Sequence, residues 1–191
     1  MNSKLFLVDV DGTLLDTQKL KEANRNIFAE KFGQASALIL WDLYAQVVKE
    51  KGFADIGKIA LEATSRLKIS DPVLIQNVFF NSSFRDFLFP EALEFLRGLK
   101  SKGKVLIYSQ GDGFYQPLKI KKSGIEEVVG AENVIIREDK TKYLPQLKLD
   151  LQKEKFDEIV IIDNLPSFLE SARRVFPQAK LVLVQEGKYN T

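Results

Sequence analysis

Two carboxylates follow the first apolar run of the chain at a spacing that could hold a cation. Residues 5–8 are Leu-Phe-Leu-Val, Asp9 and Asp11 come next, and Gly12 and Thr13 form a turn. Side chains two residues apart on a strand point to the same side, where like charges repel. A bound cation would relieve this repulsion. The alternative is a strand that ends in an Asp-Gly turn with two solvated carboxylates.

Polar residues also follow three later apolar runs. They are Ser109, Gln110 and Gly111 after the second run, Lys140 after the third, and Asp163 and Asn164 after the fourth. The carboxyl ends of adjacent parallel strands converge, so we expect these side chains near Asp9 and Asp11. Alone, each has a simpler explanation: a solvated turn hydroxyl, a surface lysine or a helix cap. Lys142 is an alternative to Lys140 as the lysine of this site because it lies in the same turn.

The absence of two residue types narrows the chemistry. The chain has no histidine and no cysteine. Ser-His-Asp and Cys-His catalysis, thiolate zinc sites and disulfides are therefore excluded. A metal would be held by oxygen ligands, which favours a hard cation such as Mg²⁺.

Composition and charge indicate a globular protein. Of 191 residues, 45% are hydrophobic and 28% charged, which is enough for one substantial core with a small accessory domain. The net charge is +2 with acids and bases interleaved, so we expect neither nucleic acid nor a membrane as partner. No signal peptide or membrane-spanning stretch is predicted. We expect a cytoplasmic monomer or weak dimer.

Strand and helix patterns alternate over most of the chain. The runs expected to form strands are Lys4–Val10, Lys104–Ser109, Asn133–Arg137, Glu158–Asp163 and Lys180–Gln185. Between the later strands we expect helices from Pro90 to Gly103 and over Gly113–Lys122, Thr141–Glu154 and Leu165–Val175. This order predicts an α/β fold, a Rossmann-like parallel sheet with right-handed crossovers.

The segment between the first two strands has only helical periodicity. Its expected helices are Leu20–Phe32, Ala35–Lys51, Ala54–Leu67 and Pro72–Phe79. We therefore predict a core domain of residues 1–15 and 87–191, with residues 16–86 as a helical cap domain. Such an insert would lie over the carboxyl ends of the strands, where open α/β sheets bind ligands.

An acid pair, a hydroxyl, a lysine and an acid, in this order, resemble the motifs of the haloacid dehalogenase superfamily. Residues 9–13, Asp-Val-Asp-Gly-Thr, are similar to its first motif. The second-motif region of its helical-cap (C1) phosphatases is similar to Ser109-Gln110-Gly111, Gln116, Lys119-Ile120 and Gly124-Ile125. The resemblance spans the whole chain and implies a haloacid dehalogenase fold with a cap after the first strand.

The resemblance implies catalytic roles for the two first-motif acids. Asp9 would be the nucleophile that forms an aspartyl-phosphate, and Asp11 the general acid and base. An acid at this second position separates the phosphatases of the superfamily from its dehalogenases and ATPases. The resemblance therefore implies hydrolysis of phosphate esters.

The other motif residues would bind phosphate and metal. Mg²⁺ would be held by the Asp9 carboxylate, the Asp11 backbone carbonyl and Asp163, with Asn164 as a further candidate ligand. Ser109 and Lys140 would act on the phosphate as catalytic residues. The phosphate-binding set would be Gly12, Thr13, Ser109, Gln110, Gly111 and Lys140.

The fourth motif departs from its commonest form. Ile162 stands where many relatives have glycine, and Ser167 where they have a second acid. Asp163-Asn164 instead resembles the acid-amide pair of phosphatases that act on the polymerase carboxyl-terminal tail. This departure bears on metal affinity more than on reaction type.

We expect a Mg²⁺-dependent phosphatase acting on a small phosphorylated metabolite. The cap would choose the substrate, with candidate contacts in the turn of residues 49–53 and at Trp41 and Tyr44, although aromatic residues at helical spacing are typical of a core. One alternative is a phosphomutase with the same covalent intermediate. The other is a non-catalytic binding module that retains the fold.

Overall fold

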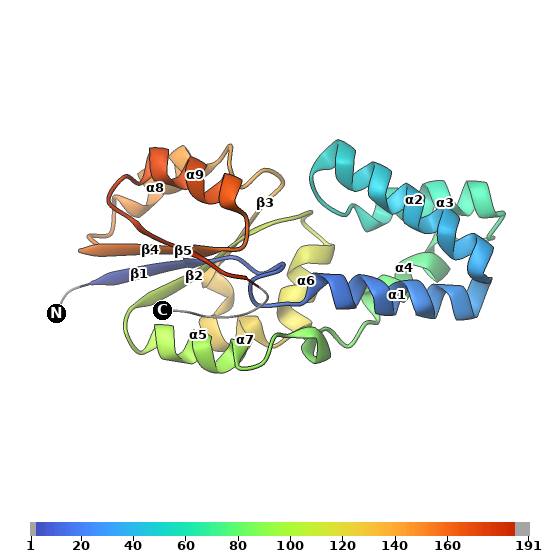
Figure 1. The fold of residues 1–191 in the computed structure, drawn as a ribbon, viewed down its shortest axis with the longest axis horizontal. Helices are drawn as coiled ribbons and strands as arrows, with labels where there is room; N and C mark the ends of the chain where they lie inside the picture. Colours follow the sequence, from blue (N-terminus) through green and yellow to red (C-terminus); the bar gives the residue numbers. More distant parts are fainter. Residues whose placement is uncertain (1–2, 186–191) are drawn as a thin grey trace.

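The computed structural model describes residues 3–185, which form a parallel five-stranded sheet with helices around it (Figure 1). The strands are β1 (Lys4–Val8), β2 (Lys104–Gln110), β3 (Val134–Arg137), β4 (Glu158–Asp163) and β5 (Lys180–Leu183). Their order in the sheet is β3-β2-β1-β4-β5, so β1 lies at the centre. The predicted Rossmann-like α/β fold is confirmed.

The register of the sheet brings three strand ends to the same level. Val8 of β1 pairs with Ile107 of β2 and with Ile162 of β4. Asp9 and Asp163 therefore emerge side by side, and Ser109 emerges from the other neighbour of β1. This alignment is the reason that residues distant in sequence share one edge.

Helices cover both faces of the sheet. On one face are α5 (Ala92–Lys100) and α7 (Ile125–Val129), and on the other are α8 (Leu144–Leu151) and α9 (Pro166–Val175), whereas α6 (Tyr115–Lys122) lies near the carboxyl ends of the strands (Figure 1). Side chains alternate between the two faces, as a strand requires. Val8 belongs to the hydrophobic cluster that contains Leu96, whereas Leu7 belongs to the one that contains Phe168.

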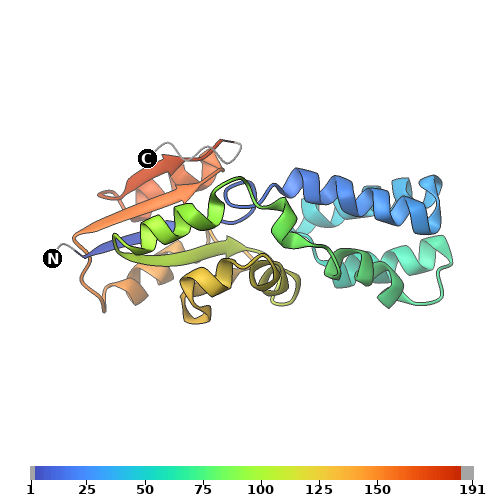
Figure 2. The same cartoon turned by 90° about the horizontal axis from the view of Figure 1, so that it is seen from below.

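Four helices between β1 and β2 extend beyond the carboxyl ends of the strands (Figures 1 and 2). They are α1 (Thr17–Phe32), α2 (Gln34–Lys51), α3 (Ile56–Leu67) and α4 (Pro72–Phe80). Their buried side chains, such as Phe28 and Leu40, form one continuous cluster with Val10 next to the sheet. Because the packing is continuous, the domain boundaries proposed above stay a prediction.

Several elements differ from expectation at their ends. β1 stops at Val8 because the carbonyl oxygen of Val10 accepts hydrogen bonds from three amides of the following turn. α1 starts at Thr17, earlier than expected, because the Asp16 side chain accepts a hydrogen bond from the Lys19 amide and so caps the helix. β5 ends at Leu183 rather than Gln185.

Helices around the sheet show similar differences. α8 is shorter than the predicted Thr141–Glu154, and α5 begins only at Ala92, after Glu91 in the left-handed region with φ 64°. α7 and two short 3-10 helices, Phe84–Phe87 and Ala131–Asn133, were not predicted. Over the described residues, every helix is too short or too polar to cross a membrane.

Candidate active site

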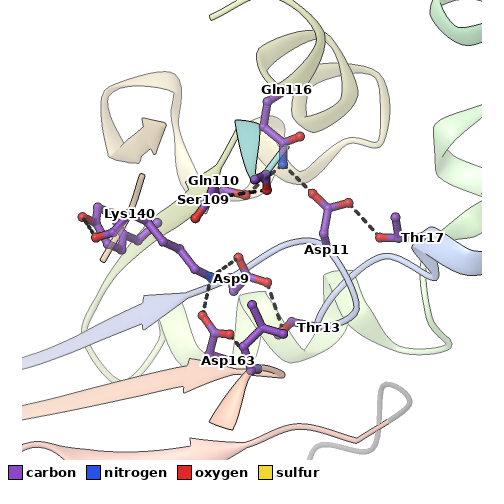
Figure 3. A network of polar contacts seen from close by, with 12 residues as sticks. Asp9, Asp11, Thr13, Thr17, Ser109, Gln110, Gln116, Lys140 and Asp163 are labelled. Atoms are coloured by element: carbon purple, nitrogen blue, oxygen red, sulfur yellow. Dashed lines mark hydrogen bonds and ion pairs between the residues drawn. The ribbon is translucent and has the colours of Figure 1, made fainter. Parts of the chain in front are cut away.

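Asp9 follows β1 directly and lies against a buried lysine. Its backbone amide donates to the Ile162 carbonyl of β4, and its side chain is 5% exposed. The Lys140 ammonium lies 2.8 Å from Asp9 Oδ1 and 2.5 Å from Asp163 Oδ2 (Figure 3). Lys142 lies elsewhere, exposed, with its ammonium over the Tyr143 ring. The structure therefore places Lys140, not Lys142, beside the two acids.

The charges of Asp9, Asp163 and Lys140 do not cancel. Burial raises the pKa of Asp9 to about 7, Lys140 opposes this, and the nearby Asp163 adds to it. Burial also raises the pKa of Asp163, again opposed by Lys140. Although burial alone lowers the pKa of Lys140, the two carboxylates outweigh it and leave the pKa raised. Two buried carboxylates and one ammonium leave an excess negative charge, which favours a further cation.

An unpaired amide oxygen lies next to these acids. Asn164 Oδ1 is the buried side-chain atom without a hydrogen-bond partner among the described residues. Gly12 has φ 78°, and a Cβ at this position would lie 2.3 Å from Asn164 Nδ2. Only glycine lets the turn after β1 approach the Asn164 amide so closely.

The donor set fits a hard divalent cation. Within residues 3–185 no three acidic side chains are grouped as metal ligands. The oxygens available are the carboxylates of Asp9 and Asp163 and the unpaired Asn164 Oδ1, all of which suit Mg²⁺. An amide in place of a third carboxylate is consistent with the Asp-Asn form of the fourth motif.

The Asp11 carboxylate is directed away from Asp9 and is held by three side chains. Thr17 Oγ1 donates to Oδ1 at 2.7 Å, and Gln116 Nε2 donates to Oδ2 at 2.8 Å (Figure 3). The Lys119 ammonium donates to both oxygens, at 2.5 and 2.7 Å. Burial raises the pKa of Asp11, but Lys119 and the other two donors outweigh it, so the pKa is lowered.

The predicted phosphate-binding residues of β2 lie at the same edge. Ser109 is fully buried, and its Oγ accepts a hydrogen bond of 2.8 Å from Gln116 Nε2. Gln110 reaches the helical insert, where its Nε2 donates to the Gly52 carbonyl. A Cβ on Gly111 would lie 2.6 Å from Gln116 Cβ, so glycine is needed there for the approach of α6.

In the turn of the first motif, the Thr13 side chain contacts Asp9. Thr13 Oγ1 donates to Asp9 Oδ2 at 3.3 Å. Gly12 shapes the site through its backbone: its positive φ allows the turn after β1 to lie close to Asn164. The roles of both residues in phosphate binding stay predictions.

A cavity of about 210 Å³ lies between the sheet edge and the helical insert, and Asp9, Asp11 and Lys140 line its floor. Of the predicted substrate contacts, three line this cavity: Gly52, Phe53 and Tyr44. Two others in the turn of residues 49–53 form ion pairs instead, Glu50 with Lys58 and Lys51 with Asp55. Trp41 is not part of the lining and stacks on Tyr44 and Phe79.

Three residues that hold Asp11 were not among the predicted site residues, although Gln116 and Lys119 belong to the region that resembles the second motif. The three residues are Thr17, Gln116 and Lys119. The last two are spaced by three residues on α6, so they share one helix face. That spacing, in a helix that follows the Gly111 turn, is the signal that could have identified them.

Comparison with known proteins shows the family to which the chain belongs. A parallel sheet of this strand order, with helices on both faces, is a Rossmann-like α/β fold. A model of the family described as haloacid dehalogenase-like hydrolase matches residues 3–164. The chain belongs to this family. No curated protein matches the sequence.

Solved structures share the fold at low sequence identity. One is a protein from Burkholderia xenovorans described as a haloacid dehalogenase-like hydrolase, with TM-score 0.84 and 24% identity over 96% of this chain and 82% of that one. A haloacid dehalogenase-family enzyme from Bacteroides thetaiotaomicron, in complex with magnesium and inorganic phosphate, has TM-score 0.63 and 14% identity over 99% and 98% of the two chains. The L-2-haloacid dehalogenase of Xanthobacter autotrophicus has TM-score 0.56 and 15% identity over 96% and 78%.

Proposed function

We propose that this protein is a Mg²⁺-dependent phosphatase that hydrolyses a small phosphomonoester through an aspartyl-phosphate. The observation that carries the proposal is that Asp9, Lys140 and a second acid, Asp11, line one cavity. A nucleophile, a neutralising cation and a proton donor are the groups that phosphoryl transfer requires. Asp9, Asp163 and Asn164 would hold Mg²⁺, which when bound would supply neutralisation of charge on the phosphate oxygens.

In the first half of the reaction, a carboxylate oxygen of Asp9 attacks phosphorus and the bond to the ester oxygen breaks. Lys140 stabilises the negative charge that gathers between nucleophile and phosphate. Ser109 binds a phosphate oxygen, whereas the Gly111 amide donates to the Arg137 carbonyl. Asp11 gives a proton to the leaving oxygen. The charge of a bound phosphate opposes the influence of Lys119 and so favours the protonated form of Asp11 that this step uses.

In the second half, water hydrolyses the acyl-phosphate bond on Asp9. Asp11, now a carboxylate, takes a proton from the attacking water, and phosphate leaves with Asp9 restored. Lys119, Gln116 and Thr17 all donate to the Asp11 carboxylate and so stabilise the form that this step requires.

The leaving group distinguishes a phosphatase from a dehalogenase. A halide departs without a proton, so a dehalogenase gains little from an acid beside its nucleophile. An alkoxide departs with difficulty unless it is protonated. Asp11 at the cavity therefore supports a phosphate ester rather than a carbon-halogen bond as the scissile group.

The cavity supports a small substrate. Helices α1 to α4 extend over the strand ends, and Tyr44 and Phe53 from this insert line the cavity. We propose a small phosphorylated metabolite as the substrate and neither nucleic acid nor a membrane as a partner. We further propose that the protein is cytoplasmic and is a monomer or weak dimer.

Phosphate release from p-nitrophenyl phosphate tests the proposal. We expect Mg²⁺-dependent turnover by the wild type, loss after chelation with EDTA, and at least about a 1000-fold loss in Asp9→Asn, because the nucleophile is removed. Chloride release from L-2-chloropropionate, assayed in parallel, would instead indicate a dehalogenase. Equal phosphate release by wild type and Asp9→Asn would contradict the proposal. If turnover is found, a panel of phosphorylated metabolites follows, in which isomerisation of a sugar 1-phosphate would identify a phosphomutase.

A further inference from the structure

Lys119 is a buried cation beyond the groups that phosphoryl transfer itself needs. It lies on α6 with 4% exposure, and its ammonium pairs with Asp11. Removing an ammonium from water costs several kcal/mol, and a buried ion pair seldom repays this in stability. Stability alone is therefore a poor explanation for a lysine at this position.

The donors around Asp11 come from two sides and fix its carboxylate. Thr17 approaches from the start of α1 and Gln116 from α6 (Figure 3). Lys119 also belongs to α6. The lysine donates to both carboxylate oxygens, so it limits rotation of the carboxylate as well as neutralising it. The Asp11 side chain nevertheless remains 29% exposed, which leaves it open to the cavity that it lines.

Gln116 connects this acid with the predicted phosphate-binding serine. Its amide nitrogen lies 2.8 Å from Asp11 Oδ2 and 2.8 Å from Ser109 Oγ. A side-chain amide has two hydrogens, so both bonds form at once. Proton donor and phosphate-binding hydroxyl are thus held in a fixed relation by one helix.

We propose that Lys119 is a positioning residue that, together with Gln116, holds the Asp11 side chain where its carboxylic acid form can give a proton to the leaving oxygen. The inference rests on the proposed phosphatase function. Proton transfer requires the donor within hydrogen-bond reach of the leaving oxygen, and a misplacement of about 1 Å costs about 100-fold in rate. Without Lys119, the Asp11 carboxylate keeps one hydrogen bond to each oxygen, from Thr17 and from Gln116, and loses the contact that spans both oxygens.

Two substrates with different leaving groups distinguish this positioning role of Lys119 from a direct role in phosphate binding. An alkyl phosphate releases a strongly basic alkoxide, which needs a proton as it departs. p-Nitrophenolate is stable as an anion and departs without one. A donor out of position therefore slows the first substrate and barely affects the second. A lysine that binds phosphate would affect both equally, because both carry the same phosphate.

The experiment compares kcat/KM for p-nitrophenyl phosphate and for an alkyl phosphate. This parameter reports the steps up to transfer to Asp9, so slow hydrolysis of the acyl-phosphate does not mask the effect. We expect Lys119→Met to lower kcat/KM about 100-fold for the alkyl phosphate and less than about 5-fold for p-nitrophenyl phosphate. Lys121→Met, an exposed lysine on the same helix, is the matched control and should change neither.

Lys119→Gln is the second variant, because it keeps a donor of similar length if the methionine variant does not fold. Melting temperatures show whether each variant is folded. Equal losses on the two substrates, or no loss on either, would overturn the inference while leaving the phosphatase proposal intact. A wild type inactive on both substrates would overturn the phosphatase proposal and the inference with it.

Discussion

Gln110 at the end of β2 donates a 3.0 Å hydrogen bond from Nε2 to the backbone carbonyl of Gly52, in the turn between α2 and α3. The contact joins the sheet edge to the helical insert at the rim of the cavity, which both residues line. Gly52 has φ 81° and lies so close that an added Cβ would be 2.8 Å from Gln110 Nε2. The position of the insert over the acids is therefore fixed partly by a turn whose left-handed backbone favours glycine.

Replacement of Gly52 should change both stability and catalysis. We expect Gly52→Ala to lose about 1–2 kcal/mol of unfolding free energy from the left-handed backbone. It should also raise KM, because the added Cβ displaces Gln110 and the cavity rim. Gly124→Ala is the matched control: its φ of 85° and ψ of 3° are similar, but its nearest neighbours are an ordinary 3.8 Å away. Equal kinetics in the two variants would show that the contact does not serve the site.

Asn164 should matter to the metal more than to the fold. Its buried Oδ1 has no hydrogen-bond partner among the described residues. We expect Asn164→Ala to raise the Kd of Mg²⁺ at least about 10-fold by calorimetry. The metal-free protein should be no less stable, because an unsatisfied buried oxygen is removed. Asn164→Asp retains an oxygen and should keep the affinity within a few-fold. A metal-free protein destabilised by Asn164→Ala, with unchanged Mg²⁺ affinity, would assign the residue a structural role.

The contribution of Tyr108 to the stability of the fold should be lost at alkaline pH. Its hydroxyl donates to the Lys140 carbonyl at 2.6 Å, and burial raises the pKa of Tyr108 to about 12. Because this folded-state pKa exceeds the unfolded value of about 10, the contribution is complete below pH 10 and is lost as pH rises through 12. Tyr108→Phe should cost about 1 kcal/mol at pH 7 from the lost hydrogen bond.

Urea unfolding between pH 7 and pH 11.5 measures this effect. The difference in unfolding free energy between wild type and Tyr108→Phe should shrink as pH rises above 10. A constant difference over the whole range would mean that the hydroxyl titrates alike in the folded and unfolded chain.

The sheet and its acid-bearing ends were predictable because the signals are local. A fully apolar run such as residues 5–8 shows a central strand, and polar residues directly after it lie at the ligand-binding edge of a parallel sheet. The short helix α7 (Ile125–Val129) was missed because five residues are too few to show helical periodicity.

The choice between Lys140 and Lys142 could not be made from sequence. Both lie in one turn, and which ammonium enters the core depends on how that turn folds against β4. In the structure Lys140 is 2% exposed between Asp9 and Asp163. Gln116 and Lys119 could be singled out from the sequence, but their contacts with Asp11 could not be predicted, because these depend on the placement of α6 relative to α1 in three dimensions.

Asp112 should support catalysis by holding the start of the helix that carries Gln116 and Lys119. Its Oδ1 accepts hydrogen bonds from the amides of Phe114 and Tyr115. We expect Asp112→Ala to lose about 1 kcal/mol of unfolding free energy, as for a helix N-cap. It should also lower kcat/KM for an alkyl phosphate at least about 5-fold, because the first turn of α6 positions the side chains that contact Asp11.

Asp71→Ala is the control for this prediction. Asp71 caps α4 in the insert through the Val73 amide at 2.8 Å and does not line the cavity. The two variants should lose similar stability in urea, since each removes one helix cap, but only Asp112→Ala should lose activity. Similar kinetics in both would mean that α6 keeps its place without the cap. The arrangement around Asp11 would then depend on the packing of the helix rather than on its first turn.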